Sequence, residues 1–275
     1  MNTQPAEKAG NTPEEILYKK GFGTLMNEEL KEKMAAGRPE FFTECTMEVE
    51  RGENQPKDQL NFRVHWRRDD DPQKDKVYLN SFDIMVKSPD FTGIRQQNIA
   101  AGSMITALEA YRMLKYGDQV AVNKDLYNKE GQPYNTWISI DVAAPKDEYG
   151  NYPLKTFHEN YYSKRPFDLR ETLKNLPVEI KGLQSADGLE RTARMLEKAH
   201  IVHTSIKQDG QWTSGHLVVN PVKGEVCVYD KQMQLISVQQ AKPDQSPSQN
   251  AVDDVKKKSG QKLNDRYPHK QGRGI

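Results

Sequence analysis

The segments of this chain that resemble β-strands follow one another across short turns, and this spacing limits the fold more than any other feature. The clearest strand is 60–67, where Leu60, Phe62, Val64 and Trp66 alternate with polar residues. A period of two indicates a strand with one buried face. Parallel strands need long crossover connections, whereas strands joined by turns pair antiparallel. We therefore predict an α+β fold built on antiparallel sheets.

Three predicted helices begin at equal intervals of 79 residues, each after a residue that can cap a helix, namely Asn27, Thr106 and Ser185. Three strand candidates follow each helix. They lie at roughly 43–50, 60–67 and 76–86, then at 119–127, 134–142 and 152–158, and finally at 201–207, 213–219 and 225–229. We predict about three repeated units, in each of which a helix covers a three-stranded antiparallel meander.

The predicted organisation has five parts. They are a flexible N-terminal segment with a short helix at 1–24, a first unit at 25–100, a second unit with a linking helix at 101–182, a third unit at 183–240, and a disordered basic tail at 241–275. The short N-terminal helix starts at Thr12, where Pro13 and Glu15 supply a capping box. The linking helix is capped by Asp168.

The C-terminal tail has almost nothing apolar to bury, which predicts disorder. Within 255–275, seven cations stand against Asp265, a net charge of +6. A basic tail can hold nucleic acid weakly by releasing counterions, and the alternative is a solubilising end without a specific ligand. The candidate nucleic-acid-binding residues are Lys256, Lys257, Lys258, Lys262, Arg266, Lys270 and Arg273.

Composition excludes several classes of protein. No apolar run reaches the roughly 20 residues of a membrane span, and the polar start lacks the apolar core of a signal peptide. The two cysteines, Cys45 and Cys227, lie far apart in predicted strands and form no CxxC motif. This usage favours a reducing compartment, so we expect a cytoplasmic protein without membrane contact.

Two stretches gather most of the polar and aromatic side chains that a ligand site would need. The candidate ligand cluster consists of Asn123, Lys124, Asp125, Tyr134, Asn135 and His158. Adjacent residues on a strand point to opposite faces, so His158 and Glu159 are not expected to act on one proton. An enzymatic site assembled between units around His158, Asp125 and Asp141 stays open as an alternative, because such residues need only meet in space.

Metal and cofactor sites are not predicted. His200 and His203 form an HxxH pair, but they fall where a helix ends and a strand begins, so their side chains should diverge. The chain has no phosphate-binding GxxxxGK[ST] loop and no complete dinucleotide-binding glycine pattern. Arg63, His65 and Arg67 share the solvent face of one strand, where we expect nearby acids to balance them.

Three segments carry a resemblance to a known family. The segment from Val120 to Trp137 resembles a GRAVNKDLTNKEGQKYNAW pattern. The segment from Gly150 to Leu169 resembles GNY…FHENYGYDL with a lengthened join at 162–167, and Val218 to Asp230 resembles EANPQFKTINVYD. The chain is thus similar, over about 25–238, to a family of uncharacterised proteins carried on conjugative and mobilisable elements of gut bacteria. The resemblance implies a bacterial cytoplasmic protein associated with mobile DNA and implies no catalytic residues.

These observations favour a non-enzymatic binding or accessory protein of mobile DNA, which docks a protein or nucleic-acid partner. No catalytic constellation stands out along the chain, and small sheet-and-helix units with a basic tail suit docking. Besides the enzyme, a further alternative is a structural scaffold that self-associates through free sheet edges.

Overall fold

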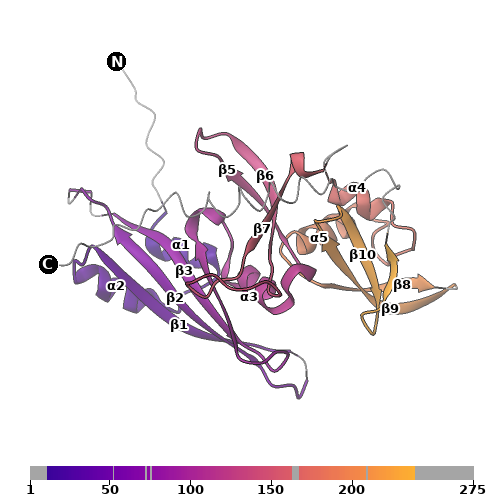
Figure 1. The fold of residues 1–275 in the computed structure, drawn as a ribbon, viewed down its shortest axis with the longest axis horizontal. Coiled ribbons are helices and arrows are strands. Elements are labelled where there is room, and N and C mark those ends of the chain that lie inside the picture. The colour runs from indigo at the N-terminus through magenta and orange to yellow at the C-terminus, as the bar shows by residue number, and fades with distance from the viewer. Residues whose placement is uncertain are drawn as a thin grey trace. The chain divides into compact units, whose positions relative to one another are not determined.

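A computed structural model describes residues 11–51, 53–71, 73–74, 76–162, 167–208 and 210–238. It confirms the α+β class with antiparallel sheets, because the strands form three sheets in the orders β1-β2-β3-β4, β5-β6-β7 and β11-β10-β9-β8 (Figure 1). The chain divides into two compact units, one of Met1–Ile94 with Asn98–Leu108 and the other of Arg95–Gln97 with Glu109–Ile275. The expected division into three repeated units stays a prediction.

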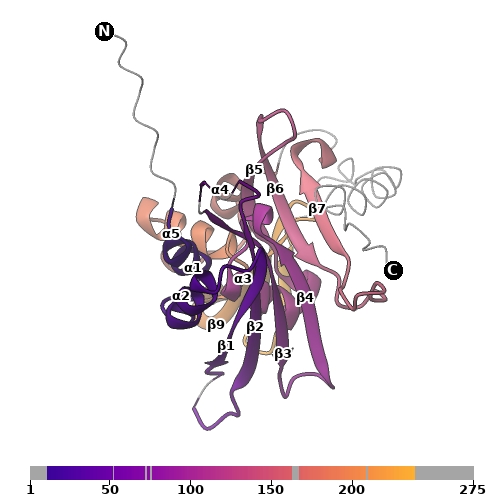
Figure 2. The same ribbon diagram turned by 90° about the vertical axis from the view of Figure 1, so that its left-hand side faces the viewer.

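The first unit contains two helices and a four-stranded sheet. The helices are α1 (Pro13–Lys20) and α2 (Asn27–Ala35), the strands are β1 (Glu40–Val49), β2 (Asp58–Arg68), β3 (Val77–Lys87) and β4 (Ile94–Ala100), and a 3₁₀ turn η1 follows at Ala101–Ser103. The helices α1 and α2 lie against one face of the sheet (Figure 2).

The predicted alternation along β2 determines which face of this sheet the helices cover. Phe62 and Trp66 are buried, whereas Arg63 lies on the opposite, exposed face. Phe22, in the turn between the two helices, packs edge-on against Phe62 and Phe82, with ring centroids 5.2 and 5.4 Å apart. Edge-to-face packing is a favourable geometry for aromatic rings, so these three rings form the centre of the first core.

The predicted helix starts are confirmed in three cases and wrong in one. Thr12 and Glu15 form the predicted capping box at α1, and the side chains of Asp168 and Ser185 cap the later helices α4 and α5. At α2, however, Asn27 is already helical, and the N-cap position is Met26, which makes no side-chain hydrogen bond. The Met26 side chain is buried in the core, and an apolar side chain of this kind cannot cap a helix.

The second unit contains the other two sheets. Its helices are α3 (Ala107–Tyr116), α4 (Leu169–Lys174) and α5 (Ala186–Leu196), with 3₁₀ turns η2 (Gly117–Gln119) and η3 (Glu159–Tyr161). The part of α3 from Glu109 onward belongs to this unit. Its strands are β5 (Val122–Tyr127), β6 (Pro133–Ile140), β7 (Leu154–His158), β8 (Val202–Gln208), β9 (Gln211–Asn220), β10 (Glu225–Asp230) and β11 (Leu235–Val238).

One apolar core joins both sheets of the second unit to α4 and α5. Trp137 of β6 and Phe157 of β7 belong to the same buried cluster as Leu173 of α4, Leu196 of α5 and Val228 of β10. Polar contacts reinforce the two helices, since Arg170 of α4 donates to both Glu190 and Glu197 at 2.7–3.0 Å. Its hydrogen bond to Arg170 lowers the pKa of the Glu190 carboxyl to about 2.

The strand count differs from the predicted three per sheet, because β4 and β11 extend the first and third sheets to four strands. The sequence of β4, IRQQNIA, has four consecutive polar residues and therefore hides its alternation. The β11 strand is only four residues long and immediately precedes the polar tail. The predicted strand at 119–127 also starts later, at Val122, after the 3₁₀ turn η2.

The outer edge of β8 is covered by the segment before α5. The N–H group of Lys181 donates to the carbonyl of Ser205, and the N–H group of Lys207 donates to the carbonyl of Glu179, both at 2.9 Å. Ile180 and Ile206 form the β-bridge between these bonds. Exposed edges are the places where sheets add foreign strands, so this segment blocks strand addition at β8.

Residues 1–10 of the predicted N-terminal segment lie outside the described part of the chain, as do the residues beyond 238, which include the predicted basic tail. Within the described ranges, no helix is long and apolar enough to cross a membrane.

A buried hydroxyl in the first core provides a test of this packing. Trp66 donates its indole N–H to Thr43 Oγ1, and the Thr43 hydroxyl donates to Met26 Sδ, both at 3.1 Å. We predict that Thr43→Val lowers the free energy of unfolding by about 1–3 kcal/mol in urea titrations, because the buried indole N–H loses its acceptor. Thr46→Val, on the exposed face of the same strand, should change it by less than about 0.5 kcal/mol. Equal losses in both variants would contradict this account.

Candidate functional site

The register of β5, β6 and β7 divides the candidate ligand cluster between two faces of the central sheet. Asp125 lies opposite Asn135, and Lys124 lies opposite Thr136, which in turn lies opposite His158. Side chains alternate along each strand, so Asn123, Asp125 and Asn135 share one face, whereas Lys124, Tyr134 and His158 belong to the other. The structure therefore does not bring the six predicted residues into one site.

The first face carries a short chain of amide and carboxylate groups. Asn123 and Asn135 exchange two side-chain hydrogen bonds of 2.7 Å, and Asn135 Nδ2 also donates to Asp125 Oδ1 at 2.8 Å. These bonds hold the Asp125 carboxylate in place at the exposed end of the sheet. Along the same face towards the core, the next β6 side chain is the buried Trp137.

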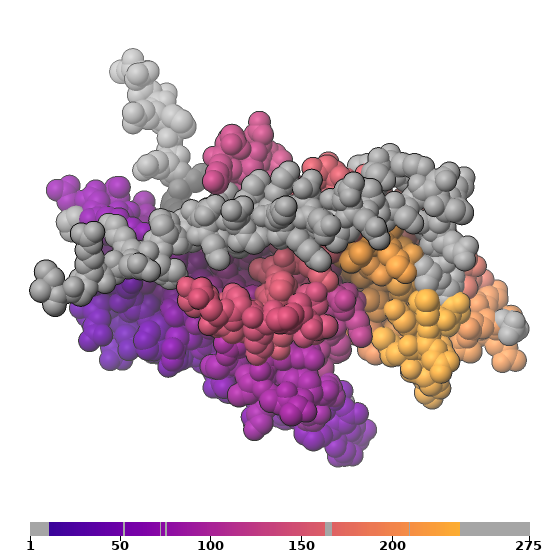
Figure 3. Space-filling model, in the orientation of Figure 1, coloured from indigo at the N-terminus to yellow at the C-terminus, as the bar shows by residue number. Residues whose placement is uncertain are grey.

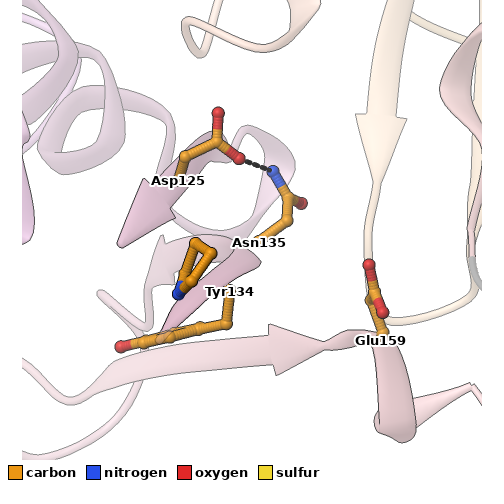
Figure 4. Close-up of a pocket in the computed structure, with 5 residues that line it drawn as sticks. Asp125, Tyr134, Asn135 and Glu159 are labelled. Atoms are coloured by element: carbon orange, nitrogen blue, oxygen red, sulfur yellow. Dashed lines mark hydrogen bonds between the residues drawn. The ribbon is translucent and has the colours of Figure 1, made fainter. Parts of the chain in front are cut away.

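A shallow hollow of about 300 Å³ lies at this end of the sheet. Asp125, Pro133, Tyr134, Asn135 and Glu159 line it. Figure 4 shows Asp125 and Asn135 joined on one side and Glu159 on a separate segment across from them. In the space-filling view the β5–β6 hairpin reaches the molecular surface (Figure 3), and its turn residues 129–132 are exposed.

The other face of the sheet uses its polar residues for structure. Lys124 Nζ bonds both carboxylate oxygens of Glu109 in α3, at 2.7 and 2.9 Å, and these side chains are only 15% and 4% exposed. A nearly buried ion pair of this kind must be matched, because either charge alone would be strongly penalised. Tyr134 packs edge-on against His158 with ring centroids 5.4 Å apart.

The third carboxylate of the alternative enzymatic site lies elsewhere. Asp141 follows the far end of β6 from Asn135, six residues or roughly 20 Å along an extended chain. It binds Lys155 Nζ at 2.8 Å, which lowers its pKa. His158 lies on the face opposite Asp125. The structure thus brings none of His158, Asp125 and Asp141 to a common point, and general acid–base catalysis needs groups within hydrogen-bond reach.

The basic strand face of the first unit is neutralised, as expected. Arg63 binds Glu44 at 2.8 Å, and His65 Nε2 lies 2.6 Å from Asp83 Oδ2. Burial raises the pKa of Asp83, but the hydrogen bonds from His65 and Asn98 outweigh burial and lower it. Arg67 pairs with Asp70. Each of these basic side chains is thus already paired with a nearby acid.

The described residues hold no group of three or more His, Cys, Asp and Glu side chains arranged to bind a metal ion. Both cysteines lie in strands, as expected, and burial raises the pKa of each thiol to about 11. Thiols with such a pKa are poor nucleophiles at neutral pH, because the reactive form is the thiolate.

The predicted nucleic-acid-binding residues of the tail lie outside the described part of the chain. They are Lys256, Lys257, Lys258, Lys262, Arg266, Lys270 and Arg273. Nucleic-acid binding by these residues stays a prediction.

Two acids beside the central sheet were absent from the predicted cluster. The burial of Glu109 beside Lys124 depends on where α3 lies on the sheet. Glu159 adjoins His158, but its place across from Asp125 depends on the turn η3 that follows β7. A local signal for Glu109 exists, since it lies one helical turn from the apolar Met113 and so on the buried face of α3.

Comparison of the chain with protein-family models, with curated proteins and with solved structures finds no match in any of the three. The family resemblance inferred from the sequence therefore stays a prediction.

The Lys124–Glu109 pair can be tested by removing one charge and then both. We predict that Lys124→Met lowers the free energy of unfolding by about 3–5 kcal/mol, because the buried Glu109 carboxylate loses its cation. The double variant Lys124→Met/Glu109→Met should regain most of this loss in the same denaturant titrations. As a control, Lys207→Met, at the half-exposed Lys207–Glu179 pair, should change stability by less than about 0.5 kcal/mol. A double variant as unstable as the single one would contradict the argument.

Proposed function

We propose that this protein is a non-enzymatic binding protein, which docks a protein partner at the hollow beside the β5–β6 hairpin. The observation that carries the proposal is that two exposed carboxylates, Asp125 and Glu159, line one open hollow. Carboxylates bind ammonium and guanidinium groups through charge-assisted hydrogen bonds. The partner that this chemistry fits is a segment bearing Lys or Arg.

Two features of the hollow support docking over catalysis. Asp125 and Glu159 are exposed, whereas electrostatic catalysis depends on a site from which water is excluded. The hydrogen bonds from Asn135 to Asn123 and Asp125 also fix the Asp125 carboxylate before a partner arrives. Pre-arranged polar groups reduce the entropic cost of binding, which favours recognition of a partner by a rigid surface.

The wider setting of the proposal rests on the sequence. The family resemblance supports a bacterial cytoplasmic protein associated with mobile DNA, in which repeated helix-and-meander units carry the docking surface. The basic tail supports a second, weak contact with nucleic acid through its phosphates. The proposed partner at the hollow is a protein, and the tail holds the complex near DNA.

Capture of binding partners tests the hollow. Full-length protein is used to retain proteins from lysates of gut bacteria that carry a conjugative element, and the retained proteins are quantified by mass spectrometry. We predict that Asp125→Asn/Glu159→Gln reduces the retained partner at least about tenfold, because both carboxylates lose their charge.

The matched control is Asp118→Asn/Glu148→Gln, which removes the same charge from two other exposed positions of the second unit. The control should retain the partner as the unchanged protein does. Equal retention by all three proteins, or equal loss in both variants, would contradict docking at this hollow.

The tail has a separate test in DNA binding. We predict that the logarithm of the affinity for a short DNA duplex falls linearly with the logarithm of the salt concentration. The triple variant Lys256→Gln/Lys257→Gln/Lys258→Gln should reduce the magnitude of this slope by about 3, because each bound cation releases about one counterion from the DNA. Fluorescence anisotropy across a salt series measures this slope. Binding that ignores salt, or a slope unchanged in the triple variant, would contradict the proposed role of the tail.

A further inference from the structure

Two histidines from neighbouring strands meet on the sheet β8–β11. His203 of β8 lies directly opposite His216 of β9, and the ring centroids are 4.5 Å apart at an interplanar angle of 72°. Their side chains share the face of the sheet opposite the one that carries the buried Val202 and Leu217. Two imidazoles are thus held at adjacent positions by strand pairing, without any help from a flexible loop.

One of these rings has a nitrogen that the protein does not satisfy. His216 Nδ1 is buried and has no hydrogen-bond partner. Buried polar atoms almost always have a partner, and an unsatisfied one calls for an explanation such as a bound ion or water. The two rings therefore combine close approach with an unused nitrogen.

A metal ion binds imidazole through the lone pair of a ring nitrogen. The geometric requirement is therefore two ring nitrogens at adjacent positions, and the pairing of His203 with His216 across the strands supplies the two rings.

We propose that His203 and His216 form a two-imidazole site for a late first-row divalent ion such as Ni²⁺, Cu²⁺ or Zn²⁺. Imidazole nitrogen suits these ions, whereas Mg²⁺ and Ca²⁺ prefer oxygen ligands. No third His, Cys, Asp or Glu in the described residues completes the set, so water fills the remaining positions. The site binds an ion reversibly from solution, because the protein supplies only two of its ligands.

Sequence spacing could not show this pair. His203 was grouped with His200, three residues away, whereas its partner is His216, thirteen residues along the chain. Burial lowers the pKa of His200, and the charges of the nearby Arg112 and Lys198 lower it further. Such cationic surroundings disfavour a divalent ion, so the HxxH motif itself is not the proposed site.

Calorimetric titration of the full-length protein with Ni²⁺ tests the proposal, with Mg²⁺ titrated in parallel. We expect one Ni²⁺ per chain and no binding of Mg²⁺. His203→Gln and His216→Gln should each weaken Ni²⁺ binding about 100-fold, because removal of one of two linked donors abolishes the chelate. Circular dichroism and thermal unfolding without metal verify that each variant is folded.

His200→Gln is the matched control, and it should leave Ni²⁺ binding unchanged. Its midpoint of thermal unfolding should still rise when Ni²⁺ is added, as in the unchanged protein, because a ligand that binds only the folded state stabilises it. The proposal is overturned if the protein binds no Ni²⁺, if both His203→Gln and His216→Gln bind it normally, or if His200→Gln abolishes binding.

Discussion

Burial of both faces of β6 is the constraint on which the second unit depends. Residues Thr136–Ile140 are all buried. One face of this stretch packs in the apolar cluster that contains Trp137, and the opposite face is the one on which Lys124 of β5 binds Glu109 of α3. A strand buried on both faces has no place for unpaired charge along its length. Polar groups free to meet a ligand are therefore confined to its first residues, and the hollow lies there.

The difference between local and tertiary signals explains how much of the fold could be predicted from the sequence. The alternation of β2 and the capping box at Thr12 are local signals, and both were readable because each depends on residues a few positions apart. The polar strand β4 and the four-residue β11 gave no such signal. They become strands because a neighbouring edge offers hydrogen bonds, which is tertiary information.

The candidate site shows the same limit at the level of side chains. Its residues were found, but their distribution over two faces follows from the register that sets Asp125 opposite Asn135. The burial of Glu109 beside Lys124 needs the position of α3, and the meeting of His203 with His216 needs the pairing of β8 with β9. Composition identifies which polar groups are present, whereas pairing across strands decides which of them meet.

The segment 179–181 along β8 has a consequence for how the protein behaves at high concentration. Because its backbone already occupies the hydrogen-bonding groups of Ser205 and Lys207, a second molecule cannot extend the third sheet from that side. Any ordered stacking of copies must then begin at a different border, such as β11. If proteolysis or a proline at Ile180 removed segment 179–181 from the edge of β8, the hydrogen-bonding groups of that edge would be exposed. Strands of other molecules could then add to it and form fibrils.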